Sequence, residues 1–289
     1  MPGTAGGPSD RSDRPFDRAA VGGIGQGVLV TANPTPPLVL AGAVGALVAV
    51  TIVALRTGAG QRLDDRAMAA LVAGRDAELT VLSVLGRVSI GAVLAVSMVC
   101  VGLALLRGRI RLAVAALLVI VGANVTTQLL KEVVLQRAAL EVIAPNSLPS
   151  GHTTVVASAV GALLLVVPWA LRLPVAVAGA LAVTVTGAST VVAGWHRPAD
   201  IVAALAVCLM WTAGAAIVAR GSSRPVPGVG IGSLAGAAAG LVLLVSIGVR
   251  PAYGWSGFLE AAIVLGAMGS ATAVAVALME RVAPISAQP

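Results

Sequence analysis

Residues 112–131 read LAVAALLVIVGANVTTQLLK, an uncharged run of 19 residues that ends on the only lysine of the chain, Lys131. A helix of about 20 mostly apolar residues crosses the hydrocarbon core of a bilayer, so this run predicts a membrane span. Its polar residues gather at the lysine end. Asn124, Gln128 and Lys131 are spaced i, i+4 and i+7, which places them on one face of the helix.

Seven further runs also lack Asp, Glu, Lys and Arg: 38–55, 88–106, 153–171, 173–195, 201–219, 225–249 and 261–279. Backbone polar groups must be paired within lipid, which favours helices, and the runs do not alternate like barrel strands. The sequence therefore predicts an all-α, polytopic helical membrane protein with eight spans. We expect a six-helix core at 37–220, a linker at 221–229, a two-helix transmembrane hairpin at 230–280 and a tail at 281–289.

The composition supports a membrane protein. Of 289 residues, 58% are hydrophobic and 11% are charged, whereas soluble domains carry about 25% charged residues. This excludes an ordinary soluble enzyme and a disordered chain. The net charge of +7 is scattered, which argues against a nucleic-acid partner. Cys100 and Cys208 both lie in apolar runs, so we interpret them as packing residues.

Two segments outside the spans differ in composition. Residues 1–36 are rich in Gly, Pro, Ser, Asp and Arg, which predicts a disordered tail. They lack the basic start and apolar core of a cleavable signal peptide. Residues 56–87 hold two short apolar stretches, 67–73 and 79–86, and we expect a cap over the outer face, with a surface helix of no chemical role as the alternative.

Arginines in the short loops predict the orientation. Arg107, Arg109 and Arg111 lie between the second and third spans, and the same side also holds Arg172, Arg220, Arg224 and Arg281. The positive-inside rule places this side, with both termini, in the cytoplasm of a cell membrane. The opposite interface is then marked by Trp195, Tyr253 and Trp255.

Unusual polar residues collect at three places on the predicted outer side. The first is the end of the third span with Asn124, Gln128, Lys131 and Arg137; the others are Pro149-Ser150-Gly151-His152, and Ser189-Thr190 with His196, Arg197 and Asp200. Each has a structural explanation alone: interhelical hydrogen bonding by amides, snorkelling cations, or a histidine as a helix cap. Together, the only lysine and both histidines indicate one functional site.

The order of these residues resembles the three-part signature of the type 2 phosphatidic acid phosphatases, a superfamily that includes vanadium haloperoxidases. The matching parts are Lys131-x5-Arg137, Pro149-Ser150-Gly151-His152 and Ser189-x6-His196-x3-Asp200. Two positions depart from the family pattern. The family places one more residue between lysine and arginine and then a proline where Ala138 stands, and it has an arginine where Thr190 stands; Arg197 is a candidate to replace that arginine.

The resemblance implies a phosphoryl transfer through a phosphohistidine at His196. Asp200 then holds the far ring nitrogen, and His152 protonates the leaving oxygen and activates water. Lys131, Arg137, Ser150 and the amides around Gly151 suit phosphate binding, because a helix N-terminus offers free N–H groups, with Thr190 as a further candidate. No acidic cluster has a spacing typical of magnesium sites, and two distant histidines make a poor zinc site, so we expect no metal or other cofactor.

The apolar frame favours a lipid phosphate or diphosphate as substrate, with polyprenyl carriers ahead of glycerolipids. Alternatives are a lipid phosphotransferase on the same scaffold, a catalytically weakened membrane scaffold or transporter, and a vanadate-dependent peroxidase. The bias toward Ala, Gly, Val and Arg is typical of a GC-rich bacterial genome.

The seventh span carries Gly232, Gly236 and Gly240 at four-residue spacing. Such a seam of small residues lets helices approach closely. We expect it to pack within the chain, with a homodimer contact as the alternative, and we expect the hairpin to carry no chemistry.

Overall fold

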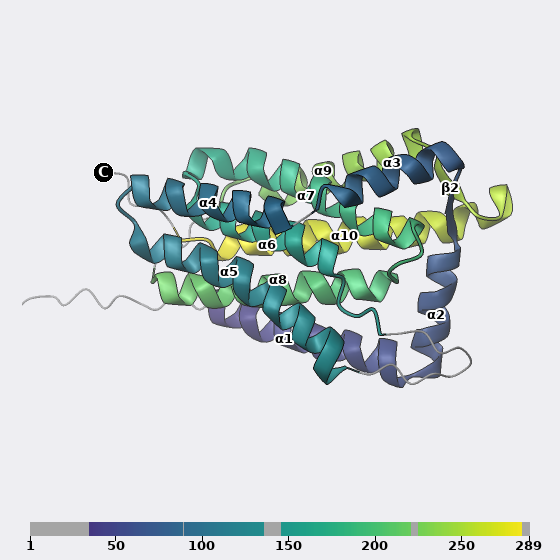
Figure 1. Cartoon of the computed structure of the whole chain (residues 1–289), viewed down its shortest axis with the longest axis horizontal. Helices are drawn as coiled ribbons and strands as arrows, with labels where there is room; N and C mark the ends of the chain where they lie inside the picture. The colour runs from purple at the N-terminus through teal and green to yellow at the C-terminus, as the bar shows by residue number, and fades with distance from the viewer. Residues whose placement is uncertain (1–34, 89, 136–145, 221–224, 285–289) are drawn as a thin grey trace, which may run out of the picture. The chain divides into compact units, whose positions relative to one another are not determined.

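A computed structural model of the chain describes residues 35–88, 90–135, 146–220 and 225–284. The predicted tail at 1–36 therefore falls almost entirely outside the described residues, as do Arg137 and Ala138. Within the described ranges the chain is built from ten α-helices and two short strands (Figure 1).

All eight apolar runs form helices, which confirms the all-α, polytopic prediction. They are α1 (Thr35–Arg56), α4 (Ile90–Leu106), α5 (Ile110–Leu129), α6 (Gly151–Val166), α7 (Trp169–Val192), α8 (Pro198–Ala219), α9 (Val229–Ser246) and α10 (Phe258–Val282). By length and composition six of the described helices can cross a membrane: α1, α5 with the π-helical turn that follows it, α7, α8, α9 and α10. The chain is a multi-pass membrane protein.

The helix α6 is shorter than the predicted span at 153–171, and that boundary was wrong. It has 16 residues, which is about 24 Å of helix and less than the hydrocarbon core of a bilayer. Pro168 ends it, because the residue before a proline is driven out of helical geometry; Val167 has ψ 151 and α7 begins at Trp169.

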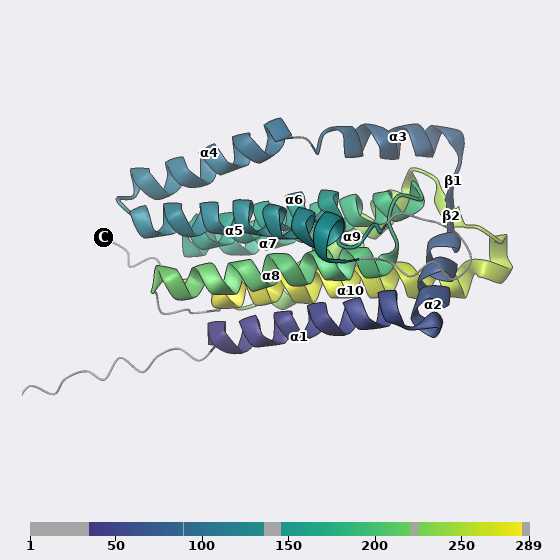
Figure 2. The same ribbon diagram turned by 60° about the horizontal axis from the view of Figure 1, so that its bottom comes forward.

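The predicted cap at 56–87 contains α2 (Gly58–Ala69), β1 (Leu71–Ala73) and α3 (Arg75–Gly86). The pair α3 and α4 is bent by 50° and, taken together, is apolar and long enough for a seventh span. The pair runs along one face of the bundle and α1 along the opposite face (Figure 2). If α3 and α4 form one bent span, only α2 and β1 remain as an end cap.

A short antiparallel sheet, which the sequence analysis did not predict, joins the cap to the C-terminal hairpin. The strand β1 pairs with β2 (Val249–Pro251), with Val72 opposite Arg250. The strand β2 lies in the turn between α9 and α10, which ends in a 3₁₀ turn at Gly254–Gly257. Three-residue strands are too short for a hydrophobic pattern to identify them.

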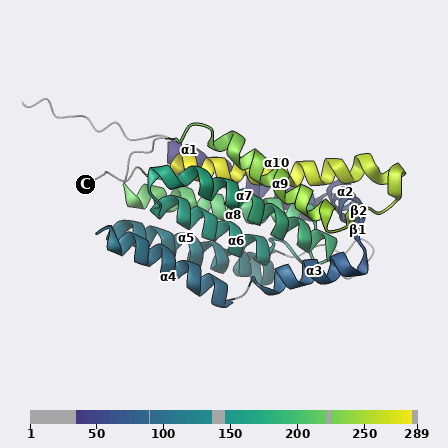
Figure 3. The same ribbon diagram turned by 90° about the horizontal axis from the view of Figure 1, so that it is seen from above.

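The glycine seam of α9 packs against α7 of the same chain, and the two helices lie side by side in Figure 3. A Cβ at Gly236 would lie 2.1 Å from the carbonyl oxygen of Val177, and one at Gly240 would lie 3.0 Å from that of Leu181. Only glycine permits this approach of two backbones. The contact is the intramolecular packing that the sequence analysis favoured over a dimer.

Arg172 lies inside α7 and is fully buried, so its assignment to a charged loop was wrong. Its guanidinium lies 3.7 Å from the carboxylate of Glu280 in α10 and donates to the carbonyl oxygens of Ala283 and Pro284. Glu280 also accepts from the N–H of Val226, ahead of α9. These contacts join the hairpin to α7 at the end of the bundle opposite the cap.

Cys100 and Cys208 are both free and fully buried, as expected for packing residues. The most buried surfaces belong to α6, α7 and α8, which lie among the other helices. Together with α5, these three helices bring the predicted site residues together at one end of the bundle.

Candidate active site

The N-terminal turn of α8 places a histidine against a buried carboxylate. His196 precedes Pro198, the first residue of the helix, and Asp200 lies in its first turn. Nδ1 of His196 is 3.2 Å from Oδ2 of Asp200. The same oxygen accepts from the backbone N–H of Arg197 at 2.9 Å. The local helix geometry therefore forms the predicted His–Asp pair.

A third donor comes from the loop before α6. The hydroxyl of Ser147 donates to Oδ2 of Asp200 at 2.6 Å. Three donors thus hold one carboxylate oxygen, and Asp200 is fully buried. A carboxylate with this many donors is stabilised in its charged form, so it is suited to orient the imidazole and to stabilise positive charge on it.

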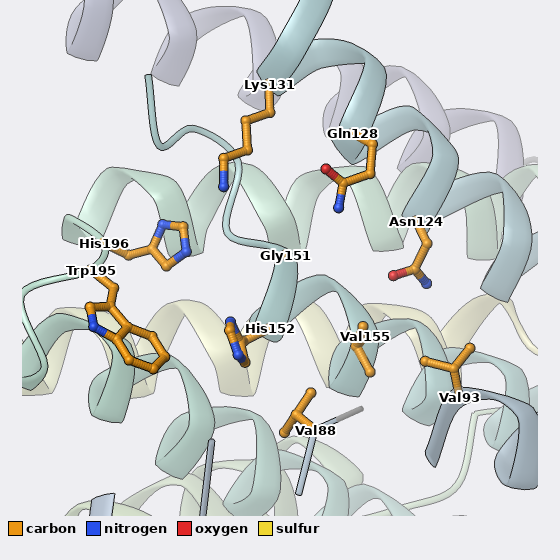
Figure 4. Close-up of a pocket in the computed structure, with 10 residues that line it drawn as sticks. All are labelled: Val88, Val93, Asn124, Gln128, Lys131, Gly151, His152, Val155, Trp195 and His196. Atoms are coloured by element: carbon orange, nitrogen blue, oxygen red, sulfur yellow. The ribbon is translucent and has the colours of Figure 1, made fainter. Parts of the chain in front are cut away.

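The other ring nitrogen of His196, Nε2, faces a cavity of about 600 Å³. Figure 4 shows the imidazole turned toward this cavity, with Lys131 opposite it and His152 beside it. The cavity is lined by Val88, Val93, Asn124, Gln128, Lys131, Gly151, His152, Val155, Trp195 and His196. The only lysine and both histidines of the chain thus meet at one site, as the sequence predicted.

The N-terminus of α6 opens onto the same cavity. Ser150 caps this helix, and its hydroxyl oxygen accepts from the N–H and from the hydroxyl of Thr153. Among the described residues the N–H groups of Gly151 and His152 have no acceptor. Free N–H groups and the helix dipole favour an anion here. A Cβ at Gly151 would meet only the amide of Gln128, at 3.9 Å, so a ligand can approach the backbone closely.

Lys131 belongs to a π-helical turn, Leu130–Val134, which extends α5. The amide of Asn146 donates to the carbonyl oxygens of Lys131 and Leu135, at 3.3 and 3.1 Å. This ties the end of α5 to the loop that leads into α6. In Figure 4 the side chain of Lys131 reaches into the cavity toward His196.

Asn124 and Gln128 line the cavity from the preceding turns of α5. The amide of Asn124 donates to Ile120 and to the hydroxyl of Ser158 in α6, at 2.8 and 3.2 Å. Asn124 therefore also provides the interhelical hydrogen bond that was the structural alternative. Gln128 has no hydrogen-bond partner among the described residues and its side chain points into the cavity.

Three predicted phosphate ligands lie away from the cavity. The hydroxyl of Ser150 is fully buried and serves as the cap of α6. The hydroxyl of Thr190 is buried and donates to the carbonyl oxygen of Gly187 at 2.7 Å. Arg197 forms an ion pair with Asp65 of α2. Arg197 thus does not stand in for the arginine missing at Thr190. Arg137 lies outside the described residues.

Sequence reasoning missed several residues that shape the site. Trp195, assigned to the membrane interface, lines the cavity and its ring lies 5.5 Å from that of His152. Its position next to His196 was an available signal. The sequence carries no signal for Ser147 or Val88. Only the folded chain brings the hydroxyl of Ser147 to Asp200, and only the folded chain brings Val88, at the bend between α3 and α4, to the cavity. No group of three or more His, Cys, Asp or Glu side chains in the described ranges is placed to hold a metal ion.

Comparison with known proteins identifies one family. Residues 88–223 match the family model of the PAP2 superfamily. The match covers α4 to α8, the helices that contribute most of the cavity. Curated proteins gave no match, and neither did solved structures.

Proposed function

Residues 88–223 match the PAP2 superfamily, and we propose that the chain is a member of it, an integral-membrane lipid phosphate phosphatase that works through a phosphohistidine. The observation that carries the proposal is the orientation of His196. Asp200 occupies Nδ1 at 3.2 Å, which leaves Nε2 facing the cavity shared with Lys131 and His152 (Figure 4).

In the first step Nε2 of His196 attacks the phosphorus, and the bond from phosphorus to the lipid oxygen breaks. His152, across the same cavity, gives its proton to the leaving oxygen. Asp200 stabilises the positive charge that develops on the imidazole of His196. In the second step His152 takes a proton from water, the water oxygen attacks the phosphohistidine, and inorganic phosphate leaves.

The phosphoryl oxygens need positive charge and hydrogen-bond donors where charge is spread in the transition state. Lys131 supplies a positive charge, and the free N–H groups of Gly151 and His152 supply donors at the N-terminus of α6. These groups act without a metal ion, so the proposed reaction is metal-independent.

A hydrocarbon tail has a place beside the phosphate. A second cavity of about 190 Å³ shares Val88, Val93 and Val155 with the first and continues between α4, α5 and α6. Apart from Arg87 its lining is apolar: Val88, Ala92, Val93, Val96, Ile120, Val155, Val156 and Ala159. This arrangement suits a lipid phosphate or diphosphate better than a soluble ester. Polyprenyl phosphates are the first class to test, followed by glycerolipid phosphates.

The loop charges support an active site on the extracytoplasmic face of a cell membrane. The N-terminal turn of α8, next to His196, contacts α2, and the loop between α4 and α5 lies at the opposite end of the bundle (Figure 1). With the basic loop inside, the N-terminal end of α1 and the C-terminal end of α10 face the cytoplasm.

The experiment is phosphate release by purified protein from a panel of polyprenyl and glycerolipid mono- and diphosphates, with and without EDTA. His196→Asn is the test variant, since the asparagine amide can still donate to Asp200 but offers no nucleophile. Tyr253→Phe, exposed at the same end, is the control. We expect turnover in EDTA by wild type and control, and loss of at least about 10³-fold in His196→Asn. Near-normal release by His196→Asn contradicts the proposal.

A further inference from the structure

The turn that carries His196 and Asp200 is also held from outside α4–α8, by α2. The first N–H groups of a helix have no partner within the helix. In α8, Pro198 has no N–H, and the N–H of Ala199 donates to Oδ1 of Asp64 at 2.9 Å. Asp64, in α2, is 6% exposed. The next residue, Asp65, pairs with the guanidinium of Arg197. Two consecutive carboxylates of α2 thus bind the residues on both sides of Pro198, at the start of α8.

The helix α2 is itself fixed in place. The side chain of Gln61 is buried and donates to the carbonyl oxygen of Leu55 at 3.0 Å, which anchors α2 to the end of α1. At its other end, the carbonyl oxygen of Ala70 accepts from the N–H of Ala252 at 2.9 Å, beside the β1–β2 pair. Asp64, the acceptor for the N–H of Ala199, therefore lies on a helix that is hydrogen-bonded to α1 at one end and to the C-terminal hairpin at the other.

We propose that Asp64 is a positioning residue for the His196–Asp200 pair. The brace formed by α2, β1 and β2 thereby fixes the direction in which Nε2 of His196 points. Oδ2 of Asp200 already accepts from Ser147, His196 and Arg197. Without Asp64 the N–H of Ala199 lacks its acceptor, and the carboxylate of Asp200, one residue away, is drawn toward it. The hydrogen bond to Nδ1 of His196 then lengthens and Nε2 turns from the phosphorus.

This inference rests on the proposed function, and it assigns a role to segments outside residues 88–223. It also explains why Arg197 is not free for phosphate, since its ion pair with Asp65 is part of the brace. A displacement of the nucleophile by a fraction of an ångström affects the chemical step more than substrate binding, because alignment is required in the transition state.

The first test compares Asp64→Ala with Asp64→Asn, whose side-chain carbonyl still accepts the N–H of Ala199. Glu78→Ala, an exposed acid on the neighbouring helix α3, is the matched control. On the best lipid of the panel we expect Asp64→Ala to lower kcat at least about 10-fold with KM changed less than about 3-fold. Asp64→Asn and Glu78→Ala should keep most of the activity. Equal kcat in Asp64→Ala and wild type overturns the proposal.

A double-mutant cycle separates positioning from general support of the fold. If Asp64 acts through the His196–Asp200 pair, Asp64→Ala changes the residual rate less than about 2-fold in an Asp200→Asn background. The same fold loss in both backgrounds contradicts the proposal. Asp64→Ser, which is too short to reach the same N–H but keeps a polar group, replaces the alanine variant if that variant does not purify as folded protein.

A readout without turnover distinguishes failure of this inference from failure of the proposed function. The chain has two histidines, so ¹⁵N-histidine labelling yields two imidazoles in the NMR spectrum. We expect the Nδ1–H signal of His196 to be retained in Asp64→Asn and Glu78→Ala, and to shift or broaden in Asp64→Ala and Asp64→Ser. An unchanged signal in those two truncations overturns the positioning role. Absence of His196-dependent turnover in wild type, with this shift present, overturns only the proposed function.

Discussion

His152 and His196 line one cavity but have different surroundings, which suit the separate roles that we propose for them. Asp200 holds Nδ1 of His196, while the ring of His152 packs beside Trp195 and its backbone lies at the open N-terminus of α6. A histidine without a carboxylate partner is free to give and take a proton, whereas the hydrogen bond to Asp200 orients the lone pair on Nε2 of His196 toward the cavity. The arrangement supports His196 as nucleophile and His152 as acid and base.

For His152→Ala we expect a slow second step, because no other described side chain at the cavity can activate water. The variant should accumulate phosphoenzyme and release phosphate at least about 10²-fold more slowly than wild type. Quenched-flow measurement of protein-bound and free phosphate separates the two steps. Equal rates for wild type and variant are incompatible with an acid–base role for His152.

For Lys131→Ala we expect kcat/KM to fall by about 10²-fold or more, because one positive charge is lost from the phosphate site. Steady-state assays with a lipid phosphate measure this. Glu132→Ala is the control, since Glu132 neighbours Lys131 in the chain but does not line the cavity. A similar loss in both variants points to damage in the π-helical turn rather than to loss of phosphate binding.

Residue spacing predicted the convergence of Lys131, His152 and His196, because each lies at a helix end on the same side of the membrane. Spacing could not place Arg197, whose partner Asp65 is 132 residues away. It also could not show that the hydroxyl of Ser150 would be used to cap α6. Contacts between segments distant in the sequence decided both outcomes.

At the level of elements, the helices were predictable from hydropathy, but their ends and faces were less so. The boundary between α6 and α7 depends on Pro168, which ends a helix within a run that carries no charge to mark the boundary. The burial of Arg172 depends on Glu280 in α10, more than 100 residues later. Sequence periodicity within either helix gives no sign of that pair.

The seam between α9 and α7 gives a prediction with a control on the same helix. Gly236→Ala should destabilise the protein by about 1–3 kcal/mol, because the added Cβ meets the backbone of Val177. Gly230→Ala meets open space and should be neutral or stabilising, since alanine favours helix. Thermal unfolding in detergent measures both. Equal melting temperatures for the two variants would show that the close approach is not required.

The buried pair Arg172–Glu280 gives a prediction about how the hairpin is attached. Arg172→Met should cost about 3–5 kcal/mol, because it leaves a buried carboxylate without its cation. Adding Glu280→Gln removes that charge while keeping an acceptor for the N–H of Val226, so the double variant should be more stable than Arg172→Met alone. Thermal unfolding checks the order. A double variant less stable than the single one contradicts the expected origin of the loss.

At the scale of the whole molecule, the segments on either side of residues 88–223 pack against the helices that carry the site: α1 and α10 contact α8, and α9 contacts α7. The N-terminal helices and the C-terminal hairpin meet through β1 and β2 at the end where the cavity lies. None of the described residues that line the cavity comes from the hairpin. Its place in the fold is to support the cap, which in turn contacts the turn of His196.

The central claim is that His196 becomes phosphorylated by a lipid phosphate at this cavity without a metal ion. The most direct measurement is acid-labile, alkali-stable label on the protein after rapid mixing with a ³²P-labelled lipid phosphate in EDTA, with the labelled residue located by mass spectrometry. The account predicts label on His196, a stronger signal in His152→Ala and none in His196→Asn. Phosphate release without any label on His196, or release that stops in EDTA and returns only with a divalent cation, would contradict it.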